Sequence, residues 1–413
     1  MKKFALVLAG GGSKGSYEVG AINALYELNY SFDIITGTSI GALNGAVLAQ
    51  GQLDRLNILW DNLIASQILK NDVTQLKLSF NMNELIQSKN LLTSFFKDYA
   101  KEKGADITPF YALINDYLDY ERLMQSPINY GCVSVEFPSL KPILMEKSQF
   151  TCKEDAFAYC LASASCFPAF PVATYKENKY IDGGYYDNLP IQFAFQMGAE
   201  QAVAIDLNKE INHLELALNP LVTTIIPSWD LGNFLDFNRE HLDRNKQLGY
   251  LDVKKQLGHY WGFKYAFEKS KKNALFTAYA KALIRYNMID EIKLLQANWY
   301  LPLQVKDYGI MAIEQLMQWF DYDPTHVYSL DAILNDINTF FEQYSTRHFN
   351  LSTIEELALN HHMNEIYILA LNTMIQRENI EINLGIASKL IGNQIKTLQY
   401  VALFILLLMN RIK

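Results

Sequence analysis

A serine stands between two glycines in Gly37-Thr38-Ser39-Ile40-Gly41, which matches the G-x-S-x-G pattern. In that pattern the serine sits on a sharp turn between a strand and a helix, where its hydroxyl oxygen can attack an acyl carbon. Gly37 and Gly41 are expected to remove the clashes that larger side chains would cause in such a turn. The pattern also recurs by chance, so the alternative is a close-packed turn with an inert serine. The apolar segments on both sides favour a nucleophile.

A second glycine-rich turn, residues 10–15, follows the first apolar run and precedes an amphipathic stretch. Consecutive glycines can turn main-chain N–H groups toward one point, and the N-terminus of the next helix adds positive potential. Such donors stabilise the negative oxygen that develops on an attacked ester carbonyl. We therefore predict an oxyanion hole in this loop. The loop residues assigned to it are Gly10, Gly11, Gly12, Lys14 and Gly15.

The same loop also matches G-x-G-x-x-G, the fingerprint of dinucleotide-binding proteins, through its first, third and last glycines. That fingerprint needs an acidic residue at the end of the second strand, where it binds the ribose. Asp33 stands instead at the beginning of the second predicted strand. The G-x-x-x-x-G-K-[ST] spacing of a P-loop is absent. A nucleotide-binding oxidoreductase and a tight turn without a ligand stay open as alternatives.

A serine nucleophile needs a neighbouring base, which is usually a histidine. No histidine precedes His213 in this chain. Neither His213 nor His241 stands at a predicted strand end beside a glycine turn, so both are interpreted as ordinary surface or helix residues. A carboxylate is therefore the expected base.

Three aspartates compete for this role. Asp182-Gly183-Gly184 follows a predicted strand directly, and the two glycines would let another segment approach closely. Asp187 lies in the same loop, and Asp206 ends the next predicted strand. Asp182 is our first choice, and the other two stay open.

Short apolar runs alternate with stretches of helical periodicity in the first half of the chain. This order predicts an α/β fold with a mostly parallel sheet and crossover helices. Such a sheet would bring the serine turn and the glycine loop to the same edge. The predicted strands are residues 4–9, 32–35, 129–135, 175–181, 202–207 and 222–226, and the helices nearest the motifs are residues 17–28 and 40–48.

The sequence changes character after about residue 229, where glycine becomes scarcer and helix-forming residues dominate. We predict a catalytic domain over residues 1–260 and a mainly helical region over residues 261–413. The apolar run 401–409 is too short to span a bilayer, which takes about 20 residues. A core helix is the favoured interpretation of this run, and an interfacial anchor stays open.

The composition limits the kinds of partner. The net charge of −8 argues against nucleic acid, and with 50% hydrophobic residues the chain can bury a large core. Peripheral membrane contact stays open, through apolar side chains or a local basic patch. The four cysteines form no C-x-x-C pair, and no histidine lies among them, so no metal site is expected. Without a secretory signal pattern, we expect a cytoplasmic protein with reduced thiols.

Taken together, the glycine loop, the serine turn and Asp182-Gly183-Gly184 resemble the patatin-like phospholipases. Asn188-Leu189-Pro190 and the stretch 162–171 also look like that family, and residues 226–250 look like the tail of its bacterial members. The resemblance covers roughly residues 4 to 255.

The resemblance implies a three-layer α/β/α fold and the hydrolysis of lipid acyl esters without a cofactor. It makes Ser39 the nucleophile, Asp182 the base and Gly10 to Gly12 the oxyanion donors. Lys14 would occupy the basic position of the loop, which is arginine in many members. The helical C-terminal region is expected to act as a lid or a docking surface. A catalytically silent lipid-binding protein with the same fold stays open.

Overall fold

The computed structural model describes residues 3–68, 106–167, 169–209, 219–271, 273–288, 303–344, 363–379 and 394–411. The chain divides into two compact units, Met1–Val253 and Lys254–Lys413. The sequence placed the boundary at residues 260/261, inside the second unit.

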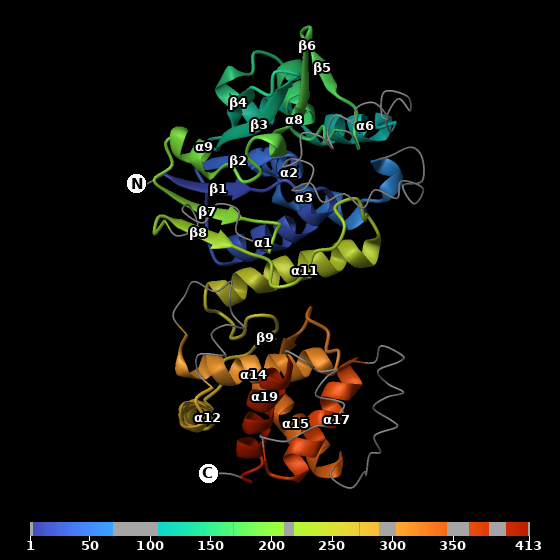
Figure 1. Cartoon of the computed structure of the whole chain (residues 1–413). Coiled ribbons are helices and arrows are strands. Elements are labelled where there is room, and N and C mark those ends of the chain that lie inside the picture. The colour runs from blue at the N-terminus through green and yellow to red at the C-terminus, as the bar shows by residue number, and fades with distance from the viewer. Residues whose placement is uncertain are drawn as a thin grey trace. The chain divides into compact units, whose positions relative to one another are not determined.

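Eight strands in the described part of the first unit form one sheet, drawn from blue to green in Figure 1. Its order is β5-β6-β3-β2-β1-β7-β8, and β4 pairs with β3. All pairings from β3 to β8 along this order are parallel, whereas β4, β5 and β6 are joined by antiparallel pairings. The strands are β1 (Phe4–Leu8), β2 (Ile34–Thr38), β3 (Asn129–Phe137), β4 (Pro142–Glu146), β5 (Ala173–Tyr175), β6 (Asn178–Asp182), β7 (Gln201–Ile205) and β8 (Val222–Ile225).

Helices cover both faces of this sheet, as two neighbouring residues of β3 show. Successive side chains of a strand point to opposite faces. Tyr130 donates from its hydroxyl to the carbonyl of Ala42 in α2, at 2.8 Å. A Cβ atom on the next residue, Gly131, would lie 2.6 Å from the ring of Phe193 in α9. Helices α2 (Ile40–Ala49) and α9 (Ile191–Gln196) therefore lie on opposite faces, and the predicted three-layer α/β/α arrangement is confirmed.

The other helices described in this unit lie between or after its strands in the chain (Figure 1). The α1 helix begins directly after the glycine loop, and α11 packs across it so closely that a Cβ atom on Gly249 would lie 1.9 Å from the carbonyl oxygen of Tyr17. These other helices are α1 (Gly15–Glu27), α3 (Leu53–Asn62), α6 (Thr108–Tyr117), α7 (Tyr120–Gln125), α8 (Lys153–Ser163) and α11 (Arg239–Gln256).

The prediction of a single strand over residues 175–181 is wrong. The segment belongs to a hairpin, in which β5 and β6 are joined through Lys176 and Glu177. Both residues have a positive φ, 47° and 66° respectively, which closes a tight turn. The β6 strand then runs antiparallel to β3 and ends at Asp182, opposite Ser134.

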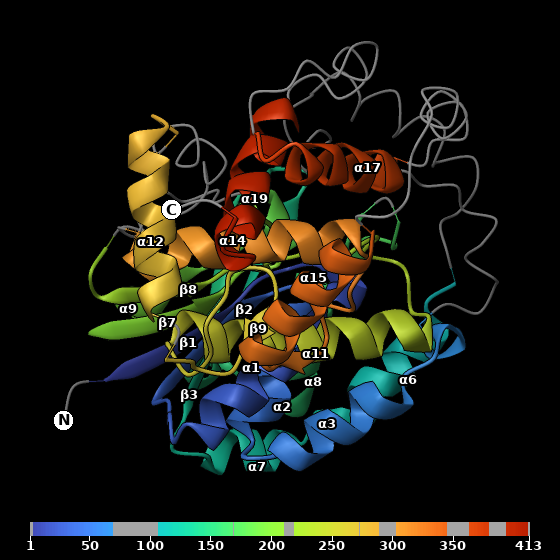
Figure 2. The ribbon, with the colours of Figure 1, turned by 90° about the horizontal axis from the view of Figure 1, so that it is seen from below.

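The second unit is mainly helical in its described part, with a short parallel pair of strands, β9 (Ala266–Phe267) and β10 (Val327–Tyr328). Helix α19 packs against the four other helices described in this unit, and its residues from Val401 to Leu406 are buried. The apolar run predicted to form a core helix therefore does form one (Figure 2). No helix in the described ranges is both long and apolar enough to cross a bilayer. The helices are α12 (Asn273–Arg285), α14 (Val305–Trp319), α15 (Leu330–Tyr344), α17 (Met363–Gln376) and α19 (Ile395–Leu408).

Candidate active site

Ser39 occupies a strained turn between β2 and α2. Its φ of 56° and ψ of −125° lie in a region that residues with a side chain rarely adopt. The glycines on either side make this turn sterically feasible. A Cβ atom on Gly37 would lie 2.4 Å from the carbonyl group of Gly41, and one on Gly41 would lie 2.6 Å from the carbonyl oxygen of Ala9. The close packing expected of a nucleophile turn is therefore present.

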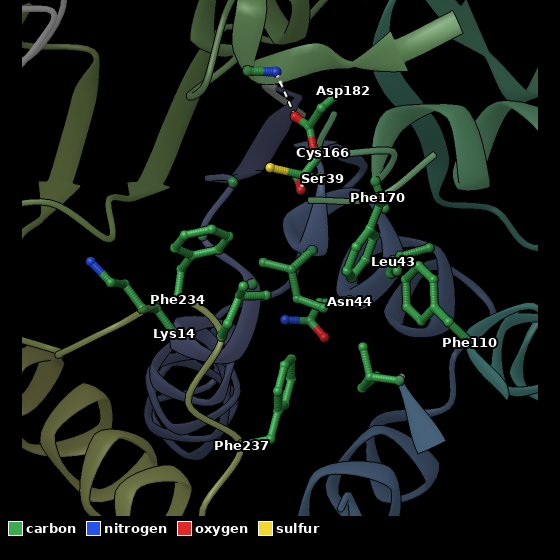
Figure 3. Close-up of a pocket in the computed structure, with 18 of the residues that line it drawn as sticks. Lys14, Ser39, Leu43, Asn44, Phe110, Cys166, Phe170, Asp182, Phe234 and Phe237 are labelled. Atoms are coloured by element: carbon green, nitrogen blue, oxygen red, sulfur yellow. Dashed lines mark hydrogen bonds between the residues drawn. The ribbon is translucent and has the colours of Figure 1, made fainter. Parts of the chain in front are cut away.

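The carboxylate of Asp182 is hydrogen-bonded to this serine. Ser39 Oγ donates to Asp182 Oδ2 at 2.6 Å, and the main-chain N–H of Gly184 donates to Asp182 Oδ1 at 2.7 Å. Figure 3 shows the two side chains side by side at one end of a cavity. The strand register explains the meeting, because Thr38 pairs with Val133 while the next residue of β3, Ser134, pairs with Asp182. Ser39 and Asp182 thus emerge at the same level of the sheet.

Burial sets the protonation behaviour of this carboxylate. Asp182 is 2% exposed, and its loss of hydration raises the pKa to about 6. The hydrogen bonds from Ser39 and Gly184 favour the ionised form and oppose part of that rise. A carboxylate with this pKa is ionised at neutral pH and is a stronger base than an exposed aspartate.

The competing bases of the sequence prediction lie in other local structures. Asp187 Oδ1 accepts the main-chain N–H of Leu189 at 3.1 Å, and Asp206 Oδ1 accepts that of Asn208 at 3.0 Å. The ring of His241 hydrogen-bonds to a side chain of its own helix, α11. His213 lies outside the described residues. Among the described carboxylates, the one hydrogen-bonded to Ser39 Oγ is Asp182.

The glycine loop passes beside Ser39, but three of its five predicted donors are used within the protein. The N–H of Gly10 donates to the carbonyl of Asn188, that of Lys14 to Gly11, and that of Gly15 to Gly12 and Ser13. These three N–H groups are therefore removed from the predicted oxyanion donors. The main-chain N–H groups of Gly11 and Gly12 have no hydrogen-bond acceptor among the described residues, and both residues line the cavity.

The dinucleotide interpretation fails on the position of Asp33. Its carboxylate accepts the N–H of Phe4, at the first residue of β1. The glycine loop follows the other end of the same strand. Asp33 therefore lies at the opposite edge of the sheet and cannot hold a ribose next to the loop.

Residues 6–195 match the family model described as patatin-like phospholipase. This part of the chain is a patatin-like phospholipase domain. The family that the three motifs predicted is therefore confirmed.

Named relatives have the same domain within much longer chains. Lysophospholipase NTE1 of Candida albicans is 27% identical over 202 residues, which is 49% of this chain and 13% of that protein. Patatin-like phospholipase domain-containing protein ZK370.4 of Caenorhabditis elegans is 30% identical over 205 residues, with the same two shares. The crystal structure of VipD from Legionella pneumophila gives a TM-score of 0.40 at 14% identity, covering 99% of this chain and 91% of that one.

Asn188 is a site residue that the sequence analysis placed only in a supporting motif. Its side-chain Nδ2 donates to the carbonyl of Gly10, while its own carbonyl accepts the N–H of Gly10, both at 3.0 Å. The residue before Asn188 contacts the Ser39 turn as well, since Thr38 Oγ1 donates to the carbonyl of Asp187 at 2.8 Å. The Asn-Leu-Pro segment of the patatin-like domain thus positions the glycine loop. Its place shortly after Asp182-Gly183-Gly184 was the available signal.

A cavity of about 640 Å³ extends from Ser39 into the patatin-like domain. Its walls come from α2, α3, α6 and the loop that precedes α11, and they are mostly apolar. In Figure 3 the aromatic rings of Phe110 and Phe170 lie on one side and Phe234 on the other. Lys14 also lines the cavity, and burial lowers the pKa of its ammonium group, although the negative charges of Asp230 and Asp206 oppose this. The space can hold a long apolar group with one end at the serine.

Proposed function

We propose that the patatin-like domain hydrolyses acyl esters of lipids, with Ser39 as the nucleophile and Asp182 as the base. The observation that carries this proposal is the 2.6 Å hydrogen bond from Ser39 Oγ to Asp182 Oδ2 at the end of an apolar cavity. The names of the relatives, which include a lysophospholipase and a patatin-like phospholipase, support a lipid substrate.

The reaction would proceed in two steps, the acylation of Ser39 and the hydrolysis of the acyl-enzyme. Asp182 takes the proton of Ser39 as the hydroxyl oxygen attacks the ester carbonyl, and the protonated carboxyl then gives that proton to the departing alcohol. The negative oxygen of each tetrahedral intermediate would be held by the N–H groups of Gly11 and Gly12, next to the N-terminal end of α1. A water molecule, deprotonated by the same carboxylate, then attacks the acyl-enzyme; the bond to Ser39 Oγ breaks, the protonated carboxyl returns the proton to Oγ, and the fatty acid is released. Because Asp182 Oδ2 is hydrogen-bonded directly to Ser39 Oγ, this proton transfer needs no histidine between the two groups.

Labelling with a fluorophosphonate tests the assignment of the nucleophile. The wild-type protein is expected to become covalently labelled in proportion to its loss of esterase activity, because the probe reacts with activated serine hydroxyls. Ser39→Ala should give neither labelling nor hydrolysis. Ser228→Ala, which removes a serine far along the chain from the motif, serves as the control and should still be labelled. Undiminished labelling of the Ser39 variant would remove this residue from its proposed role.

The raised pKa of Asp182 predicts the pH dependence of the reaction. The base must be ionised to accept a proton, so kcat/KM should rise with pH through about 6 and level off above it. Hydrolysis of an uncharged, soluble p-nitrophenyl ester should be measured from about pH 4.5 to 8. An apparent pKa near that of an exposed aspartate, with a flat profile from about pH 5 upward, would contradict the burial argument.

A further inference from the structure

The stretch 162–171 resembles the family but has no part in the mechanism above. Its first serine, Ser163, is the last residue of α8 and is completely buried. The hydroxyl oxygen of Ser163 accepts the main-chain N–H of Ser39 at 3.0 Å and donates to the carbonyl of Val133 in β3 at 2.5 Å. One hydroxyl therefore connects the serine turn to the central sheet.

This contact bears on the strained conformation of Ser39. A buried N–H group needs an acceptor, and a strained φ/ψ pair persists only where its surroundings over-determine it. At Ser39 the acceptor is a side chain, because the sharp turn carries this N–H away from the hydrogen-bonding ladder of β2. Removing the Ser163 hydroxyl would leave the N–H without this partner and would allow the turn to relax.

The same end of α8 also holds the segment of the base. The main-chain N–H of Asp182 donates to the carbonyl of Ser165 at 2.9 Å. The residue after Asp182 packs against the carbonyl that accepts from Ser163, since a Cβ atom on Gly183 would lie 2.2 Å from the oxygen of Val133. The main chains of Ser39 and Asp182 are thus held by two residues that are two positions apart.

We propose that Ser163 is a positioning residue, whose hydroxyl holds the Ser39 turn in the conformation that brings Oγ to Asp182. The inference rests on the proposed function for its kinetic effect. Its structural content is independent, because it concerns the hydrogen bond of one main-chain N–H group.

The test compares Ser163→Ala with Thr373→Val, a control variant in α17. The hydroxyl of Thr373 also donates to a main-chain carbonyl, that of Leu369 at 3.0 Å, and Thr373 does not line the cavity. Both variants lose one hydrogen-bonded hydroxyl and should show a fall in Tm. Only Ser163→Ala is expected to lose kcat, by roughly 10- to 100-fold with KM nearly unchanged, because small displacements of a reacting group are costly. An equal kcat for the two variants would overturn the proposal.

Hydrogen–deuterium exchange supplies a measurement that needs no activity. In Ser163→Ala, the amide of Ser39 should lose its protection, while the peptides of β1 and β7 keep theirs. Ser163→Cys, which keeps a weaker acceptor at the same position, should give intermediate exchange and carries the test if the alanine variant does not fold. Unchanged protection of Ser39 in both variants would refute the positioning role. A wild-type protein without esterase activity, but with the predicted change in exchange, would refute the proposed function alone.

Discussion

Asp182→Asn is expected to lower kcat by about 10²- to 10⁴-fold, the usual contribution of a general base, while making the protein more stable at neutral pH. The amide of asparagine keeps the size of the side chain and can still accept from the N–H of Gly184. It cannot take the proton of Ser39. The activity of the variant should be measured with a soluble p-nitrophenyl ester, and its stability by urea unfolding.

The gain in stability follows from the raised pKa. Between the unfolded value near 3.8 and the folded value of about 6, the folded protein binds more protons than the unfolded chain, so the stability of the wild type falls as the pH rises. Above about pH 6 the full cost of ionising the buried carboxyl is present, which amounts to about 3 kcal/mol. The asparagine variant does not bear this cost. Its advantage in free energy of unfolding should be greatest near pH 8 and vanish near pH 4.

Asp187→Asn provides the control, because this carboxylate lies in the same loop and accepts a main-chain N–H without contacting Ser39 Oγ. It should retain hydrolysis. Full activity in Asp182→Asn, or an equal loss in Asp187→Asn, would move the base away from Asp182.

Sequence motifs sufficed to predict the segments that adopt their shape locally. The serine turn and the glycine loop are each defined by neighbouring glycines, and the strand–turn–helix order around them follows from short apolar runs. The structure accordingly has α2 beginning directly after Ser39 and α1 directly after the glycine loop. The order of strand, turn and helix can therefore be read from residues close to each motif, whereas the exact conformation of the Ser39 turn also depends on Ser163, which is far away in sequence.

The choice among the three aspartates depends on the pairing of distant strands instead. Asp182 reaches Ser39 because β6 returns antiparallel to β3, with Asp182 opposite Ser134. The turn that sends β6 back contains Lys176 and Glu177, both with positive φ. Neither is a residue type that favours this conformation, so the sequence showed one strand where the structure has a hairpin.

The oxyanion donors could not be distinguished within the glycine loop for a similar reason. The N–H of Gly10 is used by Asn188, which is far away in sequence. The carbonyl oxygen of Phe234 also packs against the loop, where it accepts the N–H of Ser13 at 2.7 Å. It lies so close to Gly12 that a Cβ atom there would not fit. Only the folded structure shows which main-chain donors remain for a substrate.

The second large effect is expected from narrowing the cavity at Val47. Ile40, Leu43, Asn44 and Val47 line the cavity at helical spacing along α2. Val47 lies two turns beyond Ser39, or about 12 Å along the helix axis. Val47→Trp should fill the part of the cavity that would hold the distal methylenes of a long acyl chain, without reaching the serine.

If about four methylenes lose their apolar surroundings, the transition state for a long-chain ester loses about 3 kcal/mol, at about 0.8 kcal/mol each. We therefore expect Val47→Trp to lower kcat/KM for a palmitoyl ester by roughly 100-fold, and to change the value for an acetyl ester by less than about twofold. Val47→Leu, which adds less volume, should give a smaller loss with the same selectivity. An equal loss on both esters would indicate damage to the Ser39 turn instead of a shortened cavity. An undiminished rate on the palmitoyl ester would mean that the acyl chain lies elsewhere, because a tryptophan at this position cannot share the space with it.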